Sequence, residues 1–473
     1  MRATVLNEPE LEFGSGKHVD TRFGLLNHGP FDHFHALAPK QIKVGMVGTS
    51  SSIEAFGRFL ANCADGIAAK ESRQPNLFPP FPGYAQDGGL PATLVTDRLL
   101  EREIPPPEIA SLVAKDLSQE KLVEEAVALF ISEITVLAEA NFADVIVCAP
   151  PVELLAKLDT AQSALKEGPF DFHDLLKAKA MRFHKGTQLI LPATYDPETK
   201  YRRHDANKET RRLQDPATRA WNLYVALYYK ANGTPWRLPK DPSSFDTCFL
   251  GISFFRTLDK LRLNTSVAQI FNERGDGVVV RGGPAQVSKE DRQPHLSIND
   301  AAELVIRALS AYRKVHKHAP ARLVIHKSSL YTDEERRGFL AALNQQQIEL
   351  FDFLKVGDST TRLFRNGKYP PLRGTFLSLD EQTHVLYTRG SVDFFRTYPG
   401  MYVPRPLEFR CENNGTSPQR LAEEILGLTK MNWNNTQFDG AAPITLRAAR
   451  QVARVLRYTD SNSSIEQRYS FYM

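Results

Sequence analysis

Short apolar runs alternate with helical patterns along the first half of the chain, and this alternation restricts the fold more than any other feature. Residues 41 to 49 (QIKVGMVGT) read as a buried strand, and residues 51 to 63 continue as an amphipathic helix with a serine cap. Further along, a helix is expected over residues 121 to 141 and strands over 144 to 151 and 187 to 195. This order favours an α/β fold built on a mostly parallel, three-layered sheet.

A proline-bearing segment, TPWRLPKDPSS (234 to 244), separates two halves of the chain. The helix before it ends in YYKANG, and the run after it, TCFLGISFF, reads as a buried strand. The later pattern predicts a hairpin that turns at Gly275 to Gly277, a strand over 322 to 329, helices beginning near Ser297 and Thr332, and a hairpin over 374 to 390. We expect a lead-in segment over 1–40, one domain over 41–240 and a second over 241–473.

The composition favours a cytoplasmic protein that does not enter a membrane. Hydrophobic residues make up 42% and charged residues 24% of the 473 residues, and no apolar run approaches the roughly 20 residues that span a bilayer. The N-terminus lacks the pattern of a secretory signal. The cysteines lie far apart and mostly in apolar segments, which favours buried thiols over disulfides or a zinc site: Cys63, Cys148, Cys248 and Cys411.

Positive charge is concentrated in one part of the chain. Residues 177 to 240 contain 14 Lys and Arg against 5 Asp and Glu, which gives +9 there and −5 elsewhere, because the whole chain carries +4. This concentration favours a phosphate-bearing partner, and a solvated lysine-rich helix face is the alternative. The glycine turn after the first strand, Gly48-Thr49-Ser50, lacks the Gly-Lys-Ser/Thr of a nucleoside-triphosphate site.

A second basic feature lies near the C-terminus, where Pro443 stands at a plausible first position of a helix. Four arginines repeat at i, i+3, i+7 and i+10 and therefore share one helix face: Arg447, Arg450, Arg454 and Arg457. No acidic residue occurs between Pro443 and Tyr458. This pattern favours contact with the backbone of a nucleic acid, and a structural stripe that pairs with acidic neighbours is the alternative.

Several motifs, in this order, resemble a short prokaryotic Argonaute from Leu11 to the C-terminus. They are LEFG, DTRFGLLNHGPF, WNLYVALYYKANGTPWRL, CFLGISFF, RLVIHKSS and NWNNTQFDGAAPITLRAARQVARVLRY. The resemblance implies an α/β protein with a Rossmann-like MID domain followed by an RNase H-like PIWI domain. It also implies a short guide strand with a 5′-phosphate, with RNA favoured, and a complementary single-stranded DNA target.

The family resemblance also implies a pocket for the guide 5′-phosphate in the basic window. The residues that match its pattern are His204, Lys208, Gln214 and Lys230. An exposed loop histidine and a lysine at a helix end are the alternatives for His204 and Lys230. The C-terminal carboxylate of Met473 is the expected ligand of a magnesium ion on the guide phosphate, and a frayed tail is its alternative.

The resemblance predicts that the second domain binds nucleic acid without cutting it. A nuclease of this kind holds two metal ions between clustered carboxylates. The carboxylate positions are occupied by Ser253 in Leu-Gly-Ile-Ser and by Lys327 in Ile-His-Lys. A serine is not a charged metal ligand and an ammonium group repels a cation, so no catalytic metal is expected.

Three functions remain open. The favoured one is an inactive guide-binding subunit of a heterodimer, whose partner carries an APAZ region and a sirtuin-like or TIR domain, with the sirtuin-like domain favoured. Target recognition would then activate NAD destruction by the partner, as antiviral defence or abortive infection against phage or plasmids. The alternatives are an active guided endonuclease and a sequence-independent module that binds single strands.

Overall fold

The computed structural model describes residues 3–85, 88–163, 170–196, 198–199, 213–240, 245–258, 263–271, 277–364, 366, 370–398, 403–437, 440–459 and 465–473. The chain divides into two compact units. Unit 1 contains Met1–Phe31, Trp236–Asn432 and Gln437–Tyr469, and unit 2 contains Asp32–Pro235, Trp433–Thr436 and Ser470–Met473. The main division falls inside the proline-bearing segment. The N-terminal residues up to Phe31 belong to unit 1.

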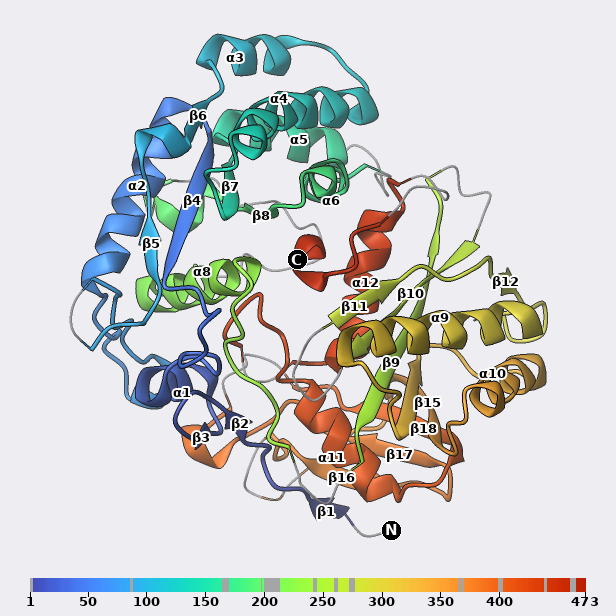
Figure 1. The fold of residues 1–473 in the computed structure, drawn as a ribbon. Coiled ribbons are helices and arrows are strands. Elements are labelled where there is room, and N and C mark those ends of the chain that lie inside the picture. The colour runs from blue at the N-terminus through green and yellow to red at the C-terminus, as the bar shows by residue number, and fades with distance from the viewer. Residues whose placement is uncertain are drawn as a thin grey trace. The chain divides into compact units, whose positions relative to one another are not determined.

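Unit 2 is built on a parallel sheet in the order β5-β4-β7-β8, with β6 also paired to β4 (Figure 1). Its strands are β4 (Gln41–Gly48), β5 (Thr93–Val95), β6 (Glu101–Glu103), β7 (Val145–Ala149) and β8 (Gly186–Leu189). Its helices are α2 (Ser50–Asp65), α3 (Pro106–Ala114), α4 (Gln119–Ala140), α5 (Val152–Ser163), α6 (Phe172–Ala180), α7 (Pro192–Tyr195) and α8 (Pro216–Lys230). Every described strand pair of this sheet is parallel, as the alternating pattern predicted.

Helices α2 and α4 cover opposite faces of strand β4. A side chain at Gly45 would meet Leu137 of α4, and a side chain at Gly48 would meet Ser52 of α2. Positions three residues apart in a strand point to opposite faces, so the sheet is enclosed on both sides. The cap of α2 is Thr49, whose side chain accepts a hydrogen bond from the backbone N–H of Ser52, and not one of the serines that follow it.

Unit 1 is built on a mixed sheet. Among the described residues nine strands follow the order β1-β16-β17-β18-β15-β14-β9-β10-β11, and only the pairs β14/β9 and β14/β15 are parallel. The strands are β1 (Ala3–Val5), β9 (Thr247–Arg256), β10 (Leu263–Phe271), β11 (Gly277–Val280), β14 (Arg322–Lys327), β15 (Leu350–Asp358), β16 (Thr375–Ser378), β17 (Thr383–Leu386) and β18 (Leu407–Asn414). Both predicted hairpins are confirmed, although Gly275 and Asp276 lie outside the described residues.

The remaining elements of unit 1 are two small ribbons and five helices. They are β2 (Leu11–Glu12), β3 (Lys17–His18), β12 (Gln286–Val287), β13 (Pro294–His295), α1 (Thr21–His28), α9 (Ile298–His316), α10 (Asp333–Gln345), α11 (Pro418–Leu428) and α12 (Ile444–Leu456). Ser297 caps α9, and Thr332 and Glu335 form a capping box at α10, so both predicted starts are confirmed. Pro443 precedes α12 as its cap residue and is not its first helical residue.

The two faces of strand β9 carry different partners. Leu250 and Ile252 join a buried apolar cluster with residues of α9 and α10. On the opposite face, a side chain at Gly251 would collide with the backbone carbonyl oxygen of Thr445. Helix α12 therefore packs directly against this glycine, and Figure 1 shows the helix beside β9 and β10.

Buried charges attach the N-terminal segment to unit 1. The Glu8 carboxylate accepts hydrogen bonds from Lys430, at 2.9 Å, and from Arg373, at 2.8 Å. The side chains of both cations are 0% exposed. Lys430 also donates to the backbone carbonyls of Pro9 and Val19. These contacts explain why residues 1 to 31 belong to this unit.

Two expectations from composition are met in the described part of the chain. No helix there is long and apolar enough to cross a membrane. All the cysteines are buried and unpaired in disulfides. Burial raises the pKa of the Cys148 thiol to about 12, which keeps it protonated.

Candidate nucleic-acid interface

Helix α8 places Lys230 in the interior of unit 2. The helix begins at the Asp215 cap, whose carboxylate accepts from the backbone N–H of Thr218, and has Pro216 as its first residue. Lys230 is the last residue of the helix, yet only 3% of it is exposed. Strand β8 approaches it so closely that a side chain at Gly186 would meet the Lys230 Cβ at 2.9 Å. Lys230 thus lies at a helix end, as its alternative interpretation expects, but its side chain is buried.

Among the described residues, the buried Lys230 ammonium group bonds only to neutral oxygens. It donates to Oε1 of Gln188 at 2.8 Å and to Oδ1 of Asn434 at 3.4 Å. Asn434 belongs to the short segment Trp433–Thr436 of unit 2, where the Trp433 ring packs on Tyr229 at 4.8 Å between centroids. No carboxylate among the described residues pairs with Lys230, which is unusual for a buried cation.

A second buried cation, Lys177 of α6, lies near the first. Lys177 is 2% exposed and donates to the backbone carbonyl of Thr187. Burial lowers the pKa of the Lys177 ammonium group to about 7. Burial also lowers the pKa of Lys230 well below its ordinary value, and repulsion from Lys177 adds to the effect. Two buried lysines whose charges repel each other would both be held charged by a nearby anion.

We call this group, Lys177, Gln188, Lys230 and Asn434, the lysine pocket. Only Lys230 was predicted as a site residue. Lys177 is the first residue of the basic window, and Asn434 lies within the motif NWNNTQFDG, so both had a weak signal in the sequence. Neither signal shows that the two segments meet, because that contact depends on the folded chain.

Of the other predicted phosphate ligands, only Gln214 lies among the described residues. His204 and Lys208 lie outside the described residues. Gln214 lies at the opposite end of α8 from Lys230, where its Oε1 accepts from Nδ2 of Asn222 at 3.0 Å. Asn222 in turn accepts from the backbone N–H of Thr436 at 2.9 Å, so Gln214 belongs to the contacts that hold the segment Trp433–Thr436.

The last residues of the chain are buried within unit 2. Ser470, Phe471, Tyr472 and Met473 are each 4% exposed or less. A short 3-10 helix spans Tyr469–Tyr472. This burial agrees with the expected docking of the tail and not with a frayed end, although it does not test the magnesium site predicted at Met473.

Strand register separates Ser253 from Lys327. Lys327 of β14 pairs with Ile252 of β9, and partners in a parallel pair point to the same face of the sheet. Ser253, one residue further, points to the other face, toward α12. The structure therefore does not bring Ser253 and Lys327 to one site. Continuing the register places Ser328, which follows the strand, opposite Ser253.

Lys327 has a structural role on its own face of the sheet. Its ammonium group is 0% exposed and bonds to the equally buried Glu335 carboxylate at 2.8 Å. It also donates to the backbone carbonyl of Leu330 at 2.6 Å. Burial lowers the pKa of Lys327, and the Glu335 carboxylate opposes that shift. This pair joins the end of β14 to the start of α10.

Three of the four predicted arginines line a cavity of about 260 Å³ between the end of β9 and helix α12. These are Arg450, Arg454 and Arg457, and the rest of the lining consists of Ser253, Phe254, Phe255, Arg256 and Ala453. Arg447 does not line it. Burial lowers the pKa of Arg447, and the neighbouring Arg389 adds to the shift while the neighbouring Tyr469 opposes it. The four arginines of α12 therefore have two different environments, because Arg447 lies outside the cavity that the other three line.

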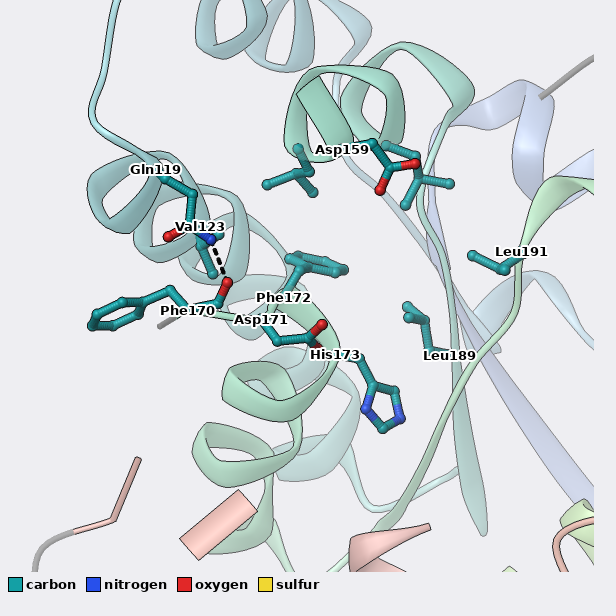
Figure 2. Close-up of a pocket in the computed structure, with 11 residues that line it drawn as sticks. Gln119, Val123, Asp159, Phe170, Asp171, Phe172, His173, Leu189 and Leu191 are labelled. Carbon is teal, nitrogen blue, oxygen red and sulfur yellow. Dashed lines mark hydrogen bonds between the residues drawn. The ribbon is translucent and has the colours of Figure 1, made fainter. Parts of the chain in front are cut away.

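One acidic cluster was not expected from the sequence. Asp171, His173 and Asp174 lie at the start of α6, with ligand atoms within 4.8 Å of one another. Figure 2 shows Asp171 and His173 beside a small cavity of about 30 Å³, which Asp159 also lines. Asp171 caps the helix, and His173 Nδ1 lies 2.8 Å from Asp174 Oδ1. Each group thus has a structural contact, and we assign no metal to the cluster.

Comparison with solved structures identifies the fold. The chain is similar to the Argonaute of Clostridium butyricum solved with a guide DNA and a 19-mer target DNA, at 16% identity and a TM-score of 0.61, covering 97% of this chain and 53% of that one. It is similar to the Marinitoga piezophila Argonaute solved with a 5′-OH guide RNA, at 12% identity and 0.58, covering 100% and 59%. Drosophila Piwi also matches, at 12% identity and 0.58, covering 99% and 56%.

The chain thus spans between half and three fifths of the length of these structures. No protein-family model matches the sequence, and no curated protein matches it. The likeness shows the fold: a mixed α/β protein like the Argonaute structures, which contain MID and PIWI domains. The predicted fold class is confirmed.

Proposed function

We propose that this chain binds a 5′-phosphorylated guide strand through its MID domain and uses that guide to recognise a complementary single-stranded nucleic acid. One observation carries the proposal: Lys177 and Lys230 are buried together, and Lys230 is bonded only to neutral oxygens. A terminal phosphate supplies the negative charge that this lysine pocket lacks. The resemblance of the sequence motifs favours an RNA guide and a DNA target.

The long contact between Lys230 and Asn434 indicates how a phosphate enters. At 3.4 Å it is weaker than the bond to Gln188 at 2.8 Å. A phosphate oxygen replacing Asn434 would give Lys230 a charge-assisted bond and free the Asn434 amide to contact the ligand. A magnesium ion would neutralise phosphate charge here. The described pocket residues offer no carboxylate, so the anionic oxygen ligands of this ion would come from the guide and from the carboxylate of Met473.

We also propose that the chain does not cut its target. Ser253 faces three arginines, and the register places Ser328 opposite it. Hydroxyl groups and guanidinium groups do not hold the metal ions that this chemistry needs.

The expected result with either magnesium or manganese is that a guide-loaded protein retains a complementary DNA and leaves it intact. Denaturing electrophoresis of an end-labelled target measures this directly. Binding should require complementarity, so a scrambled target serves as the control. Cleavage at one defined position would establish the endonuclease instead.

A binding subunit that does not cut must pass the response to another chain. We therefore propose a heterodimer with an APAZ-containing effector, sirtuin-like in preference to TIR, that destroys NAD in defence against phage or plasmids. The support is the family resemblance together with the arginines around Ser253. Co-expression with an APAZ-bearing neighbour should give a complex whose NAD consumption begins only when guide and target are both present.

A sequence-independent module for single strands is the second candidate. The arginine-lined cavity beside Ser253 favours it, because guanidinium groups contact phosphates of any sequence. The two functions differ at the guide terminus. A generic module should bind strands with a 5′-phosphate and strands with a 5′-hydroxyl equally. The lysine pocket should instead bind the phosphorylated strand more tightly.

The lysine pocket predicts a pH dependence. Burial lowers the pKa of Lys177 from 10.5 to about 7, so the unbound pocket loses charge as pH rises through that value. A terminal phosphate is a dianion above its second pKa of about 6, and binding it requires charged lysines. The affinity for a 5′-phosphorylated guide should therefore fall between pH 7 and 9, by about tenfold per pH unit for each proton taken up.

Fluorescence anisotropy across this pH range provides the measurement, and a 5′-hydroxyl guide provides the control that should stay level. The stability of the unbound protein has the opposite trend. Between about pH 7 and pH 10.5, Lys177 is more protonated in the unfolded protein than in the folded protein. Its contribution therefore raises the free energy of unfolding as pH rises. Equal pH profiles for the two guides would contradict the lysine pocket.

A further inference from the structure

The sheet of unit 1 has one covered edge and one open edge in the described part of the chain. At the covered edge, Val278 of β11 forms an antiparallel bridge with Arg468. At the other end of the sheet lies β1, beside β16 (Figure 1), and its residues Ala3, Thr4 and Val5 are all exposed. No strand among the described residues pairs with the outer side of β1. The open edge therefore belongs to β1.

The strand register shows which backbone groups of β1 face outward. Val5 pairs with Thr375 of β16, and the backbone N–H of Leu6 donates to the carbonyl oxygen of Gly374 at 2.9 Å. In an antiparallel ladder this bond flanks a pair that is not itself hydrogen-bonded, so the N–H and C=O of Val5 point away from β16. The alternation along the strand gives Ala3 the same orientation. These outward groups are the donors and acceptors with which a sheet edge binds a further strand.

Strand β1 lacks most of the features that keep another strand away. Proteins protect an open edge with charged residues, proline, a β-bulge or a very short strand. The sequence Ala-Thr-Val has no charge and no proline, and its register with β16 is regular, so only its length of three residues limits pairing. The Val5 side chain is 55% exposed, on the face of the sheet that carries Leu377 and Val385 of a buried apolar cluster. On this face the open edge is therefore apolar.

A cavity of about 490 Å³ lies on the opposite face, where β16 meets the start of α11. Its lining includes Phe376, Ser378, Gln419, Arg420 and Glu423. Because Thr4 pairs with Phe376, a further strand beside β1 projects the side chain next to Thr4 on the face that carries the cavity. Arg420 and Glu423 lie 3.7 Å apart as an ion pair. Their opposite charges leave the lining without a net charge, which suits a neutral polar side chain.

We propose that a strand of the effector partner pairs with the outer side of β1, which we call the docking edge, and places a neutral polar side chain in the cavity beside it. This inference rests on the proposed function and deepens it, because it names the surface through which the heterodimer forms. A second copy of this chain is a poorer occupant. Two copies of β1 would share at most three residue pairs, far less than a stable dimer interface, and among the strand residues only Thr4 would face the cavity.

The first test is Val5→Pro in the full chain, co-expressed with the APAZ-bearing neighbour. Proline removes the outward N–H and is tolerated in an edge strand, so the sheet of the chain itself stays intact. A carbonyl of the partner then lacks its donor, and the dissociation constant of the purified complex should rise about 10- to 100-fold. Sedimentation velocity over a dilution series measures it. Val5→Thr is the matched control, because it keeps the N–H and the branched shape and should leave the complex unchanged.

Gln419→Trp tests the cavity independently. Gln419 is exposed at the second position of α11, and an indole ring there would occupy the cavity and exclude the partner's side chain. We expect a weaker complex. Glu334→Trp is the matched control, since Glu334 is exposed at the second position of α10, a helix that packs against α9. A complex of natural stability in Gln419→Trp would contradict the placement of a partner side chain in the cavity.

The outcomes separate the docking edge from the proposed function. A complex that is as stable in Val5→Pro as in the natural chain overturns the docking edge and leaves the heterodimer standing. A natural chain that forms no complex with the effector overturns both. If the natural chain instead dimerises by itself and Val5→Pro separates the dimer, the occupant is a second copy and the proposal is wrong. Thermal denaturation shows that each variant is folded, and its guide binding should be unchanged, because the lysine pocket belongs to unit 2.

Discussion

Replacing Lys230 with methionine is expected to lower the affinity for a 5′-phosphorylated guide by about 10- to 100-fold, to the level of a 5′-hydroxyl guide. The factor corresponds to about 1.5 to 3 kcal/mol for a hydrogen bond to a charged group. The same change should raise the free energy of unfolding, because it removes a cation that is 3% exposed and bonded only to neutral oxygens. Methionine keeps the volume and flexibility of the lysine stem.

The paired measurements are anisotropy with the two guides and thermal denaturation of the unbound protein. Lys179→Met is the matched control, since Lys179 lies on the same helix as Lys177 but is exposed. It should change neither quantity. Like Lys230→Met, Lys177→Met should lower the affinity for the 5′-phosphorylated guide and raise the free energy of unfolding. A Lys230 variant that loses stability and keeps its guide discrimination would show that the lysine is structural.

Replacing Lys327 with methionine should have the opposite pattern, a large loss of stability without loss of guide discrimination. The change leaves the Glu335 carboxylate, which is 0% exposed, without its cation. Breaking a buried ion pair from one side costs about 3 to 5 kcal/mol. The double variant Lys327→Met with Glu335→Gln should recover most of this loss, because both charges are then gone.

Urea denaturation of the single and double variants gives the coupling energy between the two residues. Glu334→Gln is a suitable control, because Glu334 lies beside Glu335 on α10 but is exposed. If the folded Lys327 variant instead lost affinity for nucleic acid, Lys327 would belong to a binding site and its structural assignment would fail.

The sequence predicts those features that depend on neighbouring residues. The caps at Ser297 and Thr332, the hairpin over residues 374 to 390 and the parallel strands of unit 2 all follow from local pattern and turn chemistry. The cap of α2 lies earlier than predicted, at Thr49, since Thr49 and the serines after it are equally suited to that role. Motif order across the chain also identified the fold.

The sequence did not predict the register in which the distant strands β9 and β14 pair. Ser253 and Lys327 each end an apolar run, and nothing local determines how two distant strands align. A shift of one residue turns every side chain to the other face, and here it separates Lys327 from Ser253. The serine at 328 carries no signal of its own, so its place opposite Ser253 emerges only from the paired strands.

The sequence likewise did not predict which distant segments meet in the folded chain. Lys177 lies in the last turn of α6 and Lys230 at the end of α8, whereas Asn434 lies in a loop 204 positions after Lys230. The arginine periodicity of α12 was visible, but the pattern did not show that Arg447 meets Tyr469 while Arg457 lines a cavity. A helix face is continuous in sequence, whereas its surroundings change from turn to turn.

The most direct test of the account compares two guides that differ only at the 5′ end, one with a phosphate and one with a hydroxyl, in equilibrium binding to the natural protein near pH 7. The lysine pocket predicts that the phosphorylated guide binds about 10- to 100-fold more tightly, and that the ratio falls to one in Lys230→Met. Equal affinities for the two guides in the natural protein would contradict guide binding through Lys177 and Lys230.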